Sequence, residues 1–244
     1  MTLSAQSKAE LKWWTRHVDS AYNDACCNDP DVVVTSDPSL TGWGYLCEGV
    51  SSGGQWTSVE KSLQINYLEL KAALFALQCF QAKLKNKHVR LMLDNTTAVP
   101  CVQHMGTSHS DSCHELTFAS WSWCIENNIW VSAAHIPGKD NVIEDQVSRH
   151  INMDAEWKLN STLLLEAFQS LHIFRDTDLF ASRLNSQLEK YMYYRPDPAA
   201  VAVDAFSLSR RDITFYAFPP FSVVARVVQK VQQDEALGVL VVPD

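Results

Sequence analysis

Residues 32–37 read VVVTSD, an apolar and β-branched run that ends on a carboxylate. Residues 89–94, VRLMLD, repeat this arrangement further along the chain. Runs of this composition predict β-strands, and a carboxylate at a strand end emerges at the rim of a sheet, where α/β folds collect their active sites. The sequence therefore predicts an α/β fold with Asp37 and Asp94 at one edge of its sheet.

Two further carboxylates lie at predicted helix starts. Apolar residues recur at helical spacing over residues 68–79, so Glu69 is expected in the first turns of an amphipathic helix. Asp145 follows Asn141, a candidate helix N-cap with Glu144 at the capping-box position. Strand ends and helix starts can converge on one point, so we expect the four acids to form one site. The alternative is that they are caps and surface charges, since the chain has 28 acidic residues.

The order of predicted elements indicates a mixed sheet. Three β runs, at residues 32–37, 44–48 and 55–58, are separated by glycines suited to hairpin turns. The helix bearing Glu69 follows, then the 89–94 strand, a helix after it, a longer helix at 115–126, a strand at 129–136 and a last helix at Asp145. Three antiparallel strands followed by alternating helices and strands predict an α/β fold. The tryptophans are expected to pack in its core.

Clustered carboxylates suit divalent-metal chemistry on a nucleic-acid backbone. Hydrolysis of a phosphodiester needs an activated water, neutralised charge and a stabilised leaving oxygen, which two Mg²⁺ ions about 3.5–4 Å apart can supply. Mg²⁺ prefers hard oxygen ligands, so carboxylates are the appropriate side chains. The sequence therefore predicts a Mg²⁺-dependent nuclease in which Mn²⁺ can substitute.

The motifs around these acids resemble those of one family. Residues 31–150 resemble a ribonuclease H domain, whose quartet of acids falls on Asp37, Glu69, Asp94 and Asp145. The stretches GWG at 42–44, INYLEL at 65–70, LDNTTA at 93–98, HIPG at 135–138 and VSR at 147–149 are similar to the ribonuclease H of DIRS-type retrotransposons, which use a tyrosine recombinase. The resemblance implies a ribonuclease H-like mixed sheet with a smaller α/β C-terminal segment.

The resemblance also implies a role for each site residue. Asp37 would bridge two metal ions, Glu69 and Asp94 would complete one ion, and Asp145 the other. His135 would donate a proton or assist product release. Three polar residues are candidate nucleic-acid contacts: Asn95, Thr96 and Asn141. The implied reaction is endonucleolytic cleavage of the RNA strand of RNA/DNA hybrids, beside a reverse transcriptase domain in the same polyprotein, with 2′-hydroxyls identifying RNA.

Other functions of the same fold stay open. One is a catalytically silent nucleic-acid-binding or interaction module; another is a DNA exonuclease or integrase. An exonuclease of this kind would carry an acid where the chain has Ser39, and an integrase would lack the equivalents of Glu69 and the His135 loop. Four residues depart from the family pattern without removing an acid: Pro38, Pro100, Glu144 and Arg210. They leave the silent module as the main alternative.

Three parts are expected along the chain. Residues 1–30 resemble the end of a polymerase connection, residues 31–150 form the ribonuclease H-like domain, and residues 151–244 resemble a truncated adenine-N6 DNA methyltransferase of phage type. DLFAS at 178–182 and FPPF at 218–221 carry the last resemblance. Those enzymes hold the target amine with Asn or Asp before Pro-Pro-Tyr, whereas Phe218 accepts no hydrogen bond. We therefore expect a structural appendage that transfers no methyl group.

Composition predicts an intracellular protein, cytoplasmic or nuclear. No apolar run is long enough to span a bilayer and the start lacks the features of a signal peptide, so no membrane partner is expected. The seven cysteines all lie at or before Cys124, and their odd number argues against a disulfide framework. Cys101, His104, His109 and Cys113 have spacings close to a zinc knuckle, but they divide between a predicted helix and a loop, which disfavours zinc.

Net charge is −8, which is unusual for a nucleic-acid binder, although bound cations would offset the four proposed ligands. Local charge therefore matters more than the total. A basic run precedes the second acidic strand: Lys83, Lys85, Lys87, His88 and Arg90. It is either an edge that faces phosphates or an ordinary solvated helix end.

Overall fold

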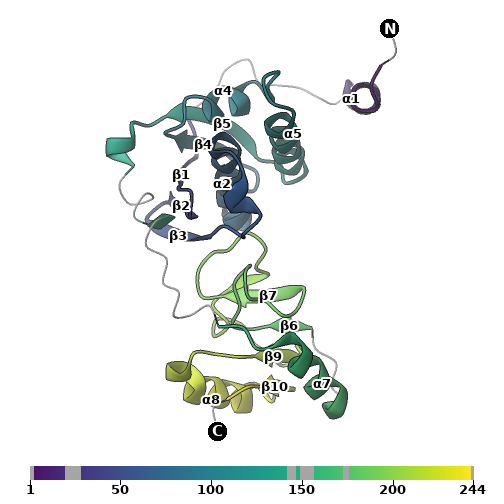
Figure 1. Cartoon of the computed structure of the whole chain (residues 1–244), viewed down its shortest axis with the longest axis vertical. Helices are drawn as coiled ribbons and strands as arrows, with labels where there is room; N and C mark the ends of the chain where they lie inside the picture. The colour runs from purple at the N-terminus through teal and green to yellow at the C-terminus, as the bar shows by residue number, and fades with distance from the viewer. Residues whose placement is uncertain (1–2, 20–28, 142–146, 149–156, 173–175, 243–244) are drawn as a thin grey trace.

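In the computed structural model the chain forms two α/β bodies stacked along the long axis of the molecule (Figure 1). The structure describes residues 3–19, 29–141, 147–148, 157–172 and 176–242. Each body is built on a five-stranded sheet. We call residues 29–148 the first unit and residues 157–242 the second unit. Within the described ranges, no helix has the length and apolar character needed to cross a membrane.

The first sheet is mixed. Strands β1 (Val32–Pro38), β2 (Gly42–Cys47) and β3 (Val50–Gln55) pair antiparallel, whereas β4 (His88–Leu93) runs parallel to β1 and β5 (Trp130–His135) runs parallel to β4. The resulting order is β3-β2-β1-β4-β5. Three antiparallel strands followed by alternating helices and strands are what the sequence predicts, so the expected fold class is confirmed.

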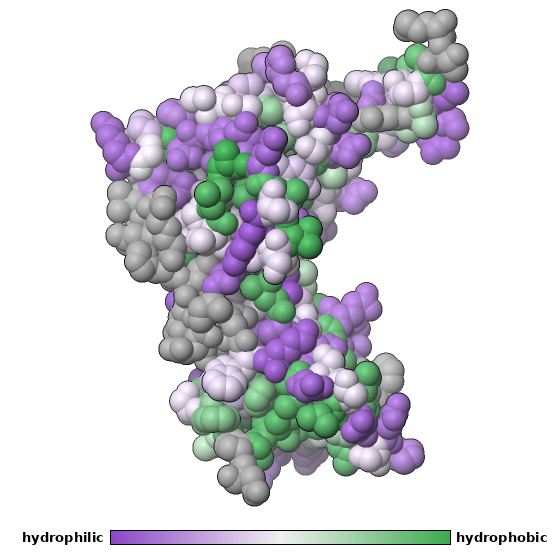
Figure 2. Space-filling model, viewed as in Figure 1, coloured by the Kyte–Doolittle hydropathy of each residue, from purple (hydrophilic) through white to green (hydrophobic). Residues whose placement is uncertain are grey.

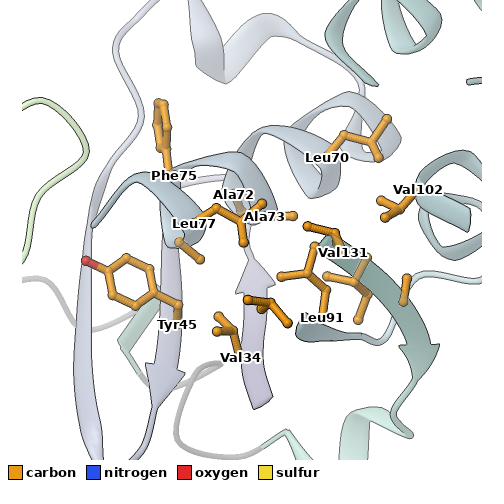
Figure 3. Close-up of a cluster of buried hydrophobic side chains, with 14 of the residues drawn as sticks. Val34, Tyr45, Leu70, Ala72, Ala73, Phe75, Leu77, Leu91, Val102 and Val131 are labelled. Atoms are coloured by element: carbon orange, nitrogen blue, oxygen red, sulfur yellow. The ribbon is translucent and has the colours of Figure 1, made fainter. Parts of the chain in front are cut away.

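Helices cover this sheet and close its core. They are α2 (Ile65–Cys79), α3 (Gln81–Leu84), α4 (Ala98–Gln103) and α5 (Asp111–Glu126), with the short turns η1 (Glu60–Ser62) and η2 (Gly138–Asp140). Figure 3 shows side chains of α2 meeting those of the strands, among them Ala72, Leu77, Val34, Leu91 and Val131. Each is at most 4% exposed, and burying an aliphatic side chain of Val or Leu size stabilises a fold by about 1.5–3 kcal/mol.

The third strand lies earlier than the sequence predicts. We expected it at residues 55–58, but β3 spans Val50–Gln55 because the chain turns at Glu48-Gly49, where both φ angles are positive (47° and 80°). A two-residue hairpin turn of this kind requires that conformation. Gly53 lies inside the strand, where an added Cβ would be 2.4 Å from the carbonyl oxygen of Trp43. Glycine is therefore required at position 53 because of this close approach, and Gly53 does not form the turn.

Helix α1 (Ala5–His17) precedes the first unit. The hydroxyl of Ser4 caps it by accepting a hydrogen bond from the amide of Ser7 at 3.0 Å. The expectation that the tryptophans pack in the core holds for the buried Trp43, Trp56 and Trp121 and for the half-buried Trp123 and Trp130, which pack against the same cluster. It is wrong for Trp14 and Trp157, which are 55% and 72% exposed.

The second sheet is parallel throughout. Its strands are β6 (Thr177–Asp178), β7 (Lys190–Tyr193), β8 (Ala202–Val203), β9 (Phe215–Ala217) and β10 (Gly238–Leu240), in the order β10-β9-β6-β7-β8. The chain builds outward from β6 on one side, then returns to β9 on the other, so the strand order reverses between β6 and β9 as in doubly wound folds. This is the smaller α/β segment expected at the C-terminal side.

Helices α7 (Ser161–Leu171) and α8 (Val224–Asp234) complete the second unit. Leu164 and Phe168 of α7 pack inward, while Leu163 and Leu165 are more than half exposed. Hydrophobic side chains gather over this unit on the face shown in Figure 2. The second unit therefore exposes a gathering of apolar side chains on this face (Figure 2).

The second unit docks on the first through a buried ion pair. Arg183, in the loop after β6, donates to both carboxylate oxygens of Glu60 at 3.1 and 3.0 Å and to the carbonyl of Gln55 at 3.0 Å. Its guanidinium also lies 4.9 Å from the centre of the Phe75 ring. Burial opposes the charged form of Glu60, yet hydrogen bonds from Lys71, the Thr57 amide and Arg183 lower its pKa to about 2.

A second contact lies in the loop after β7. The carbonyl of Pro196 accepts hydrogen bonds from the hydroxyls of Tyr45 at 2.6 Å and Ser52 at 2.8 Å. Figure 3 shows the Tyr45 hydroxyl pointing away from the core cluster. Because Arg183 and Pro196 both follow strands of a parallel sheet, the second sheet turns its carboxyl edge toward the first unit.

Candidate active site

Three of the four predicted acids come together at one edge of the first sheet. Asp37 lies near the end of β1 and Asp94 directly follows β4. The two strands are parallel and pair Ser36 with Leu93, so the two acids leave the sheet side by side. Glu69 lies on α2, which packs against β1, and the charges of Asp94 and Asp37 both act on it.

Glu69 is a buried acid in an unfavourable electrostatic position. It is 4% exposed, and its Oε2 has no hydrogen-bond partner among the described residues. Burial, followed by the charges of Asp94 and Asp37, raises the pKa of Glu69 to about 9, against a hydrogen bond with Asn95 that lowers it. A buried carboxylate beside other acids is destabilising unless it is protonated or a cation approaches. This edge of the sheet therefore favours bound positive charge.

Asn95 organises the segment that follows Asp94. Its Oδ1 accepts from the amides of Thr97 at 2.8 Å and Ala98 at 2.9 Å, and its Nδ2 donates to Oδ1 of Asn66 at 3.0 Å. This arrangement starts α4 at Ala98, so Pro100 falls in the first turn, where its missing amide has no helical partner to lose. Thr96, in contrast, is exposed.

The loop after β5 lies against Asp94. Nε2 of His135 is 3.1 Å from the carbonyl oxygen of Asp94, and since a carbonyl only accepts, Nε2 is the donor. A Cβ added to Gly138 would lie 3.6 Å from Oδ2 of Asp94, so the backbone of this loop passes beside the carboxylate. His135 itself is exposed.

Asp145 falls within residues 142–146, outside the described part of the chain. Asn141, just before it, is 1% exposed and its side-chain atoms have no partner among the described residues, so it is not placed at the surface as a nucleic-acid contact would be. After it, the carbonyl of Ser148 accepts from Oγ of Ser39 at 3.0 Å. The chain is thus again docked on the first sheet at residues 147–148.

The side chains at this edge have the oxygen donors that divalent cations prefer, but the described acids are not yet positioned around one ion. Among the described residues, no group of three or more His, Cys, Asp or Glu side chains is positioned as a metal site. The unpartnered Oε2 of Glu69 is nevertheless a hard oxygen donor whose charge is suppressed by burial and by neighbouring acids. Mg²⁺ binds through such oxygens and would relieve this repulsion.

The zinc-like spacing does not produce a cluster. Cys101 of α4 and Cys113 of α5 are 4% and 7% exposed, and burial raises the pKa of the Cys101 thiol. His104 and His109, in contrast, are exposed to solvent. The part of the chain that the structure describes contains no metal-binding group here.

The basic run lies at the start of β4, whereas Asp94 follows the end of this strand. Nζ of Lys83 pairs with Glu48 at 2.5 Å, and Nε2 of His88 lies 2.8 Å from the hydroxyl of Ser132. His88 begins β4 and Asp94 follows its end, so at a rise of about 3.3 Å per residue they are roughly 20 Å apart. Of the two readings of this run, the solvated helix end fits better than the phosphate-facing edge.

Sequence reasoning missed Asn66, which links α2 to the segment after Asp94. The helical spacing of the sequence could have identified Asn66, because it lies three residues before Glu69 and so shares a helix face with it. The bond between Arg183 and Glu60 was also missed. The partners are 123 residues apart, and nothing in their local sequence marks the pairing.

Residues 157–159 line the crevice of the second unit. In doubly wound sheets ligands bind where the strand order reverses, and here a cavity of only about 10 Å³ lies at that place, lined by Asp178, Phe218 and residues 157–159. Asn185 donates to the carbonyl of Trp157 at 3.1 Å, and Gln187 to that of Leu159 at 2.5 Å.

No protein-family model matches the chain, and no curated protein matches it. Among solved structures, ribonuclease H1 from the halophilic archaeon Halobacterium salinarum is 13% identical, with a TM-score of 0.40, over 48% of this chain and 92% of its own. LC11-RNase H1 in complex with an RNA/DNA hybrid is 20% identical, with a TM-score of 0.36, over 48% and 93%. The foamy viral protease-reverse transcriptase in complex with double-stranded DNA is 12% identical, with a TM-score of 0.31, over 56% and 30%.

Proposed function

We propose that this protein is a divalent-metal-dependent nuclease of the ribonuclease H type, which cleaves the RNA strand of RNA/DNA hybrids. The observation that carries the proposal is the buried Glu69, whose pKa is raised to about 9 beside Asp37 and Asp94. A fold gains nothing from keeping three acids together at a sheet edge unless a cation binds there. The motif resemblance and the mixed sheet support the same function.

In this proposal Asp37, Glu69 and Asp94 hold Mg²⁺ or Mn²⁺, with Asp145 as a further ligand proposed from the sequence. When bound, the metal activates water and neutralises charge on the phosphate. Glu69 releases its proton as it becomes a ligand. His135, whose Nε2 donates to the Asp94 carbonyl, would give a proton to the leaving oxygen.

The nucleic acid is held by residues around the same edge. We propose Thr96 as a direct contact, because it is exposed directly after the Asp94-Asn95 pair. Asn95 acts indirectly by fixing the start of α4. The cellular setting is also a proposal: a DIRS-type retroelement polyprotein that includes a reverse transcriptase domain, in an intracellular compartment and without a membrane partner.

A catalytically silent nucleic-acid-binding module is the second candidate. One observation favours it: in the described ranges the acids are not already arranged as a group that could hold a metal ion. With a pKa of about 9, Glu69 is protonated at neutral pH in the metal-free protein. A silent module would keep this protonated state in the presence of Mg²⁺ as well.

A cleavage assay on the full chain separates the two candidates. The substrate is an RNA/DNA hybrid labelled on either strand, incubated with Mg²⁺, with Mn²⁺ or with a chelator. We expect cuts in the RNA strand only, loss of cleavage with the chelator, and a fall of at least about 100-fold in Asp94→Asn, which removes a ligand charge while keeping the shape. The exposed Glu166→Gln should cleave like the parent. Cleavage by Asp94→Asn at the parental rate, or unaffected by the chelator, would show that the metal assignment is wrong.

A further inference from the structure

The loop between β7 and β8 displays an aromatic ring and a cation to solvent. Tyr194 is 52% exposed, and Arg195 beside it is also exposed. The guanidinium of Arg195 lies 5.1 Å from the centre of the Tyr194 ring, which is itself 4.6 Å from the ring of Tyr193. Within the described ranges Arg195 forms no ion pair, so its charge is available to a partner.

The base of this loop is held firmly. Directly after Arg195, the carbonyl of Pro196 accepts from the hydroxyls of Tyr45 and Ser52 in the first unit. Asp197 is 7% exposed, and its carboxylate accepts a short hydrogen bond from the hydroxyl of Tyr191. The exposed pair is therefore presented on an ordered support, which reduces the entropy lost when it binds a ligand.

The strand register of the first sheet aligns the Pro196 contact with the residues that precede Asp37 and Asp94. Ser52 pairs with Tyr45, Tyr45 with Ser36, and Ser36 with Leu93, so one row across the first sheet joins the Pro196 anchor to the residues that directly precede Asp37 and Asp94. Two strand spacings of about 4.8 Å separate Ser52 from Ser36, or roughly 10 Å. A nucleic-acid strand carries one phosphate per about 3.4 Å of helix axis, so this distance spans about three phosphates.

Two of the cations near this row are already engaged in ion pairs. Arg183 and Lys71 both bind Glu60, and the basic run lies at the far end of β4. With a net charge of −8 and an acidic edge, the first unit needs cations elsewhere to retain a polyanion.

We propose that Tyr194 and Arg195 of the second unit form a contact for the sugar-phosphate backbone of the hybrid. The inference rests on the proposed function and names a role for the second unit within it. Arg195 binds phosphate, and the Tyr194 ring keeps its guanidinium in place. The second unit thereby extends the nucleic-acid surface of the first.

The test measures hybrid binding by fluorescence anisotropy as a function of salt. It is carried out in the full chain bearing Asp94→Asn, so that cleavage does not interfere. We expect Arg195→Ala to weaken binding about 3- to 10-fold at low salt and to reduce the slope of log affinity against log salt by about 0.9, the value for one lost phosphate contact. Arg195→Lys should keep the slope because it keeps the charge.

Arg211→Ala is the matched control, since Arg211 is an exposed arginine that precedes β9 and so lies at the amino edge of the second sheet. It should bind like the parent. An Arg195→Ala protein with parental affinity and slope, an equal loss in Arg211→Ala, or no hybrid binding in any variant would overturn the inference. A parent that binds the hybrid but does not cleave it would refute the proposed function, while the Arg195 result would still decide this inference.

Discussion

Replacing Glu69 by glutamine tests the buried acid in the absence of metal. The folded protein raises the pKa of this carboxyl from 4.5 to about 9, so it binds the proton more tightly than the unfolded chain does. Stability is therefore greatest below about pH 4.5 and is lost as the pH rises toward 9. At pH 7, about 2.5 units above the unfolded-state value, the loss is roughly 3 kcal/mol at about 1.36 kcal/mol per unit.

Glutamine keeps the shape of the side chain and carries no charge at any pH. We expect Glu69→Gln in EDTA to raise the free energy of unfolding by up to roughly 3 kcal/mol at pH 7, and Tm by about 6–12 °C. The gain should vanish at pH 4.5 and increase at pH 8.5. Urea unfolding at the three pH values measures it, with the exposed Glu166→Gln as the matched control.

Mg²⁺ should reverse the order of the two proteins. The parent gains stability by binding the ion, whereas Glu69→Gln lacks a ligand charge and gains less. A Glu69→Gln protein that is less stable than the parent at pH 7 in EDTA would refute the reasoning. A difference that does not change with pH would do the same, because only a titrating carboxyl produces that dependence.

Two further outcomes are expected. Arg183→Met leaves Glu60 buried with Lys71 as its remaining charged partner among the described residues, and should lower the free energy of unfolding by about 3 kcal/mol in urea; Arg211→Met should have no effect. Because the pKa of Glu60 is lowered to about 2, this contribution is present above about pH 4.5 and is lost as the pH falls toward 2; equal losses in both variants would contradict it. S-adenosylmethionine should give no calorimetric signal with the full chain, since the crevice of the second unit holds a cavity of only about 10 Å³, and micromolar affinity would disprove this.

The parts of the fold that follow from local patterns were predictable. Apolar runs that end at Asp37 and Asp94 become β1 and β4, and helical spacing around Glu69 becomes α2. The start of α4 was also predictable, because Pro100 is tolerated only in a first turn.

The third strand could not be placed in the same way. Its turn uses Glu48 at a φ of 47°, a conformation that glutamate seldom adopts and that composition does not reveal. The pair Gly53-Gly54 resembles a turn in sequence, but the approach of Trp43 requires it inside the strand. Packing, rather than turn propensity, decides this register.

The second unit and part of the site depend on contacts between distant segments. Strands β6 and β8 are two residues long, too short to show any periodicity. The docking of Arg183 on Glu60 joins segments 123 residues apart. The raised pKa of Glu69 likewise depends on burial and on acids from other strands, so sequence predicted the residue but not its charge state.

Binding of Mn²⁺ to the full chain, measured by isothermal titration calorimetry, tests most directly whether the acidic edge is a metal site. We predict that the parent and Glu166→Gln bind the ion alike, that binding releases a proton from Glu69 and so varies with buffer ionisation enthalpy, and that Asp94→Asn and Glu69→Gln each weaken it at least about 10-fold. Absence of Mn²⁺ binding in the parent, or equal affinity in all four proteins, would contradict the account.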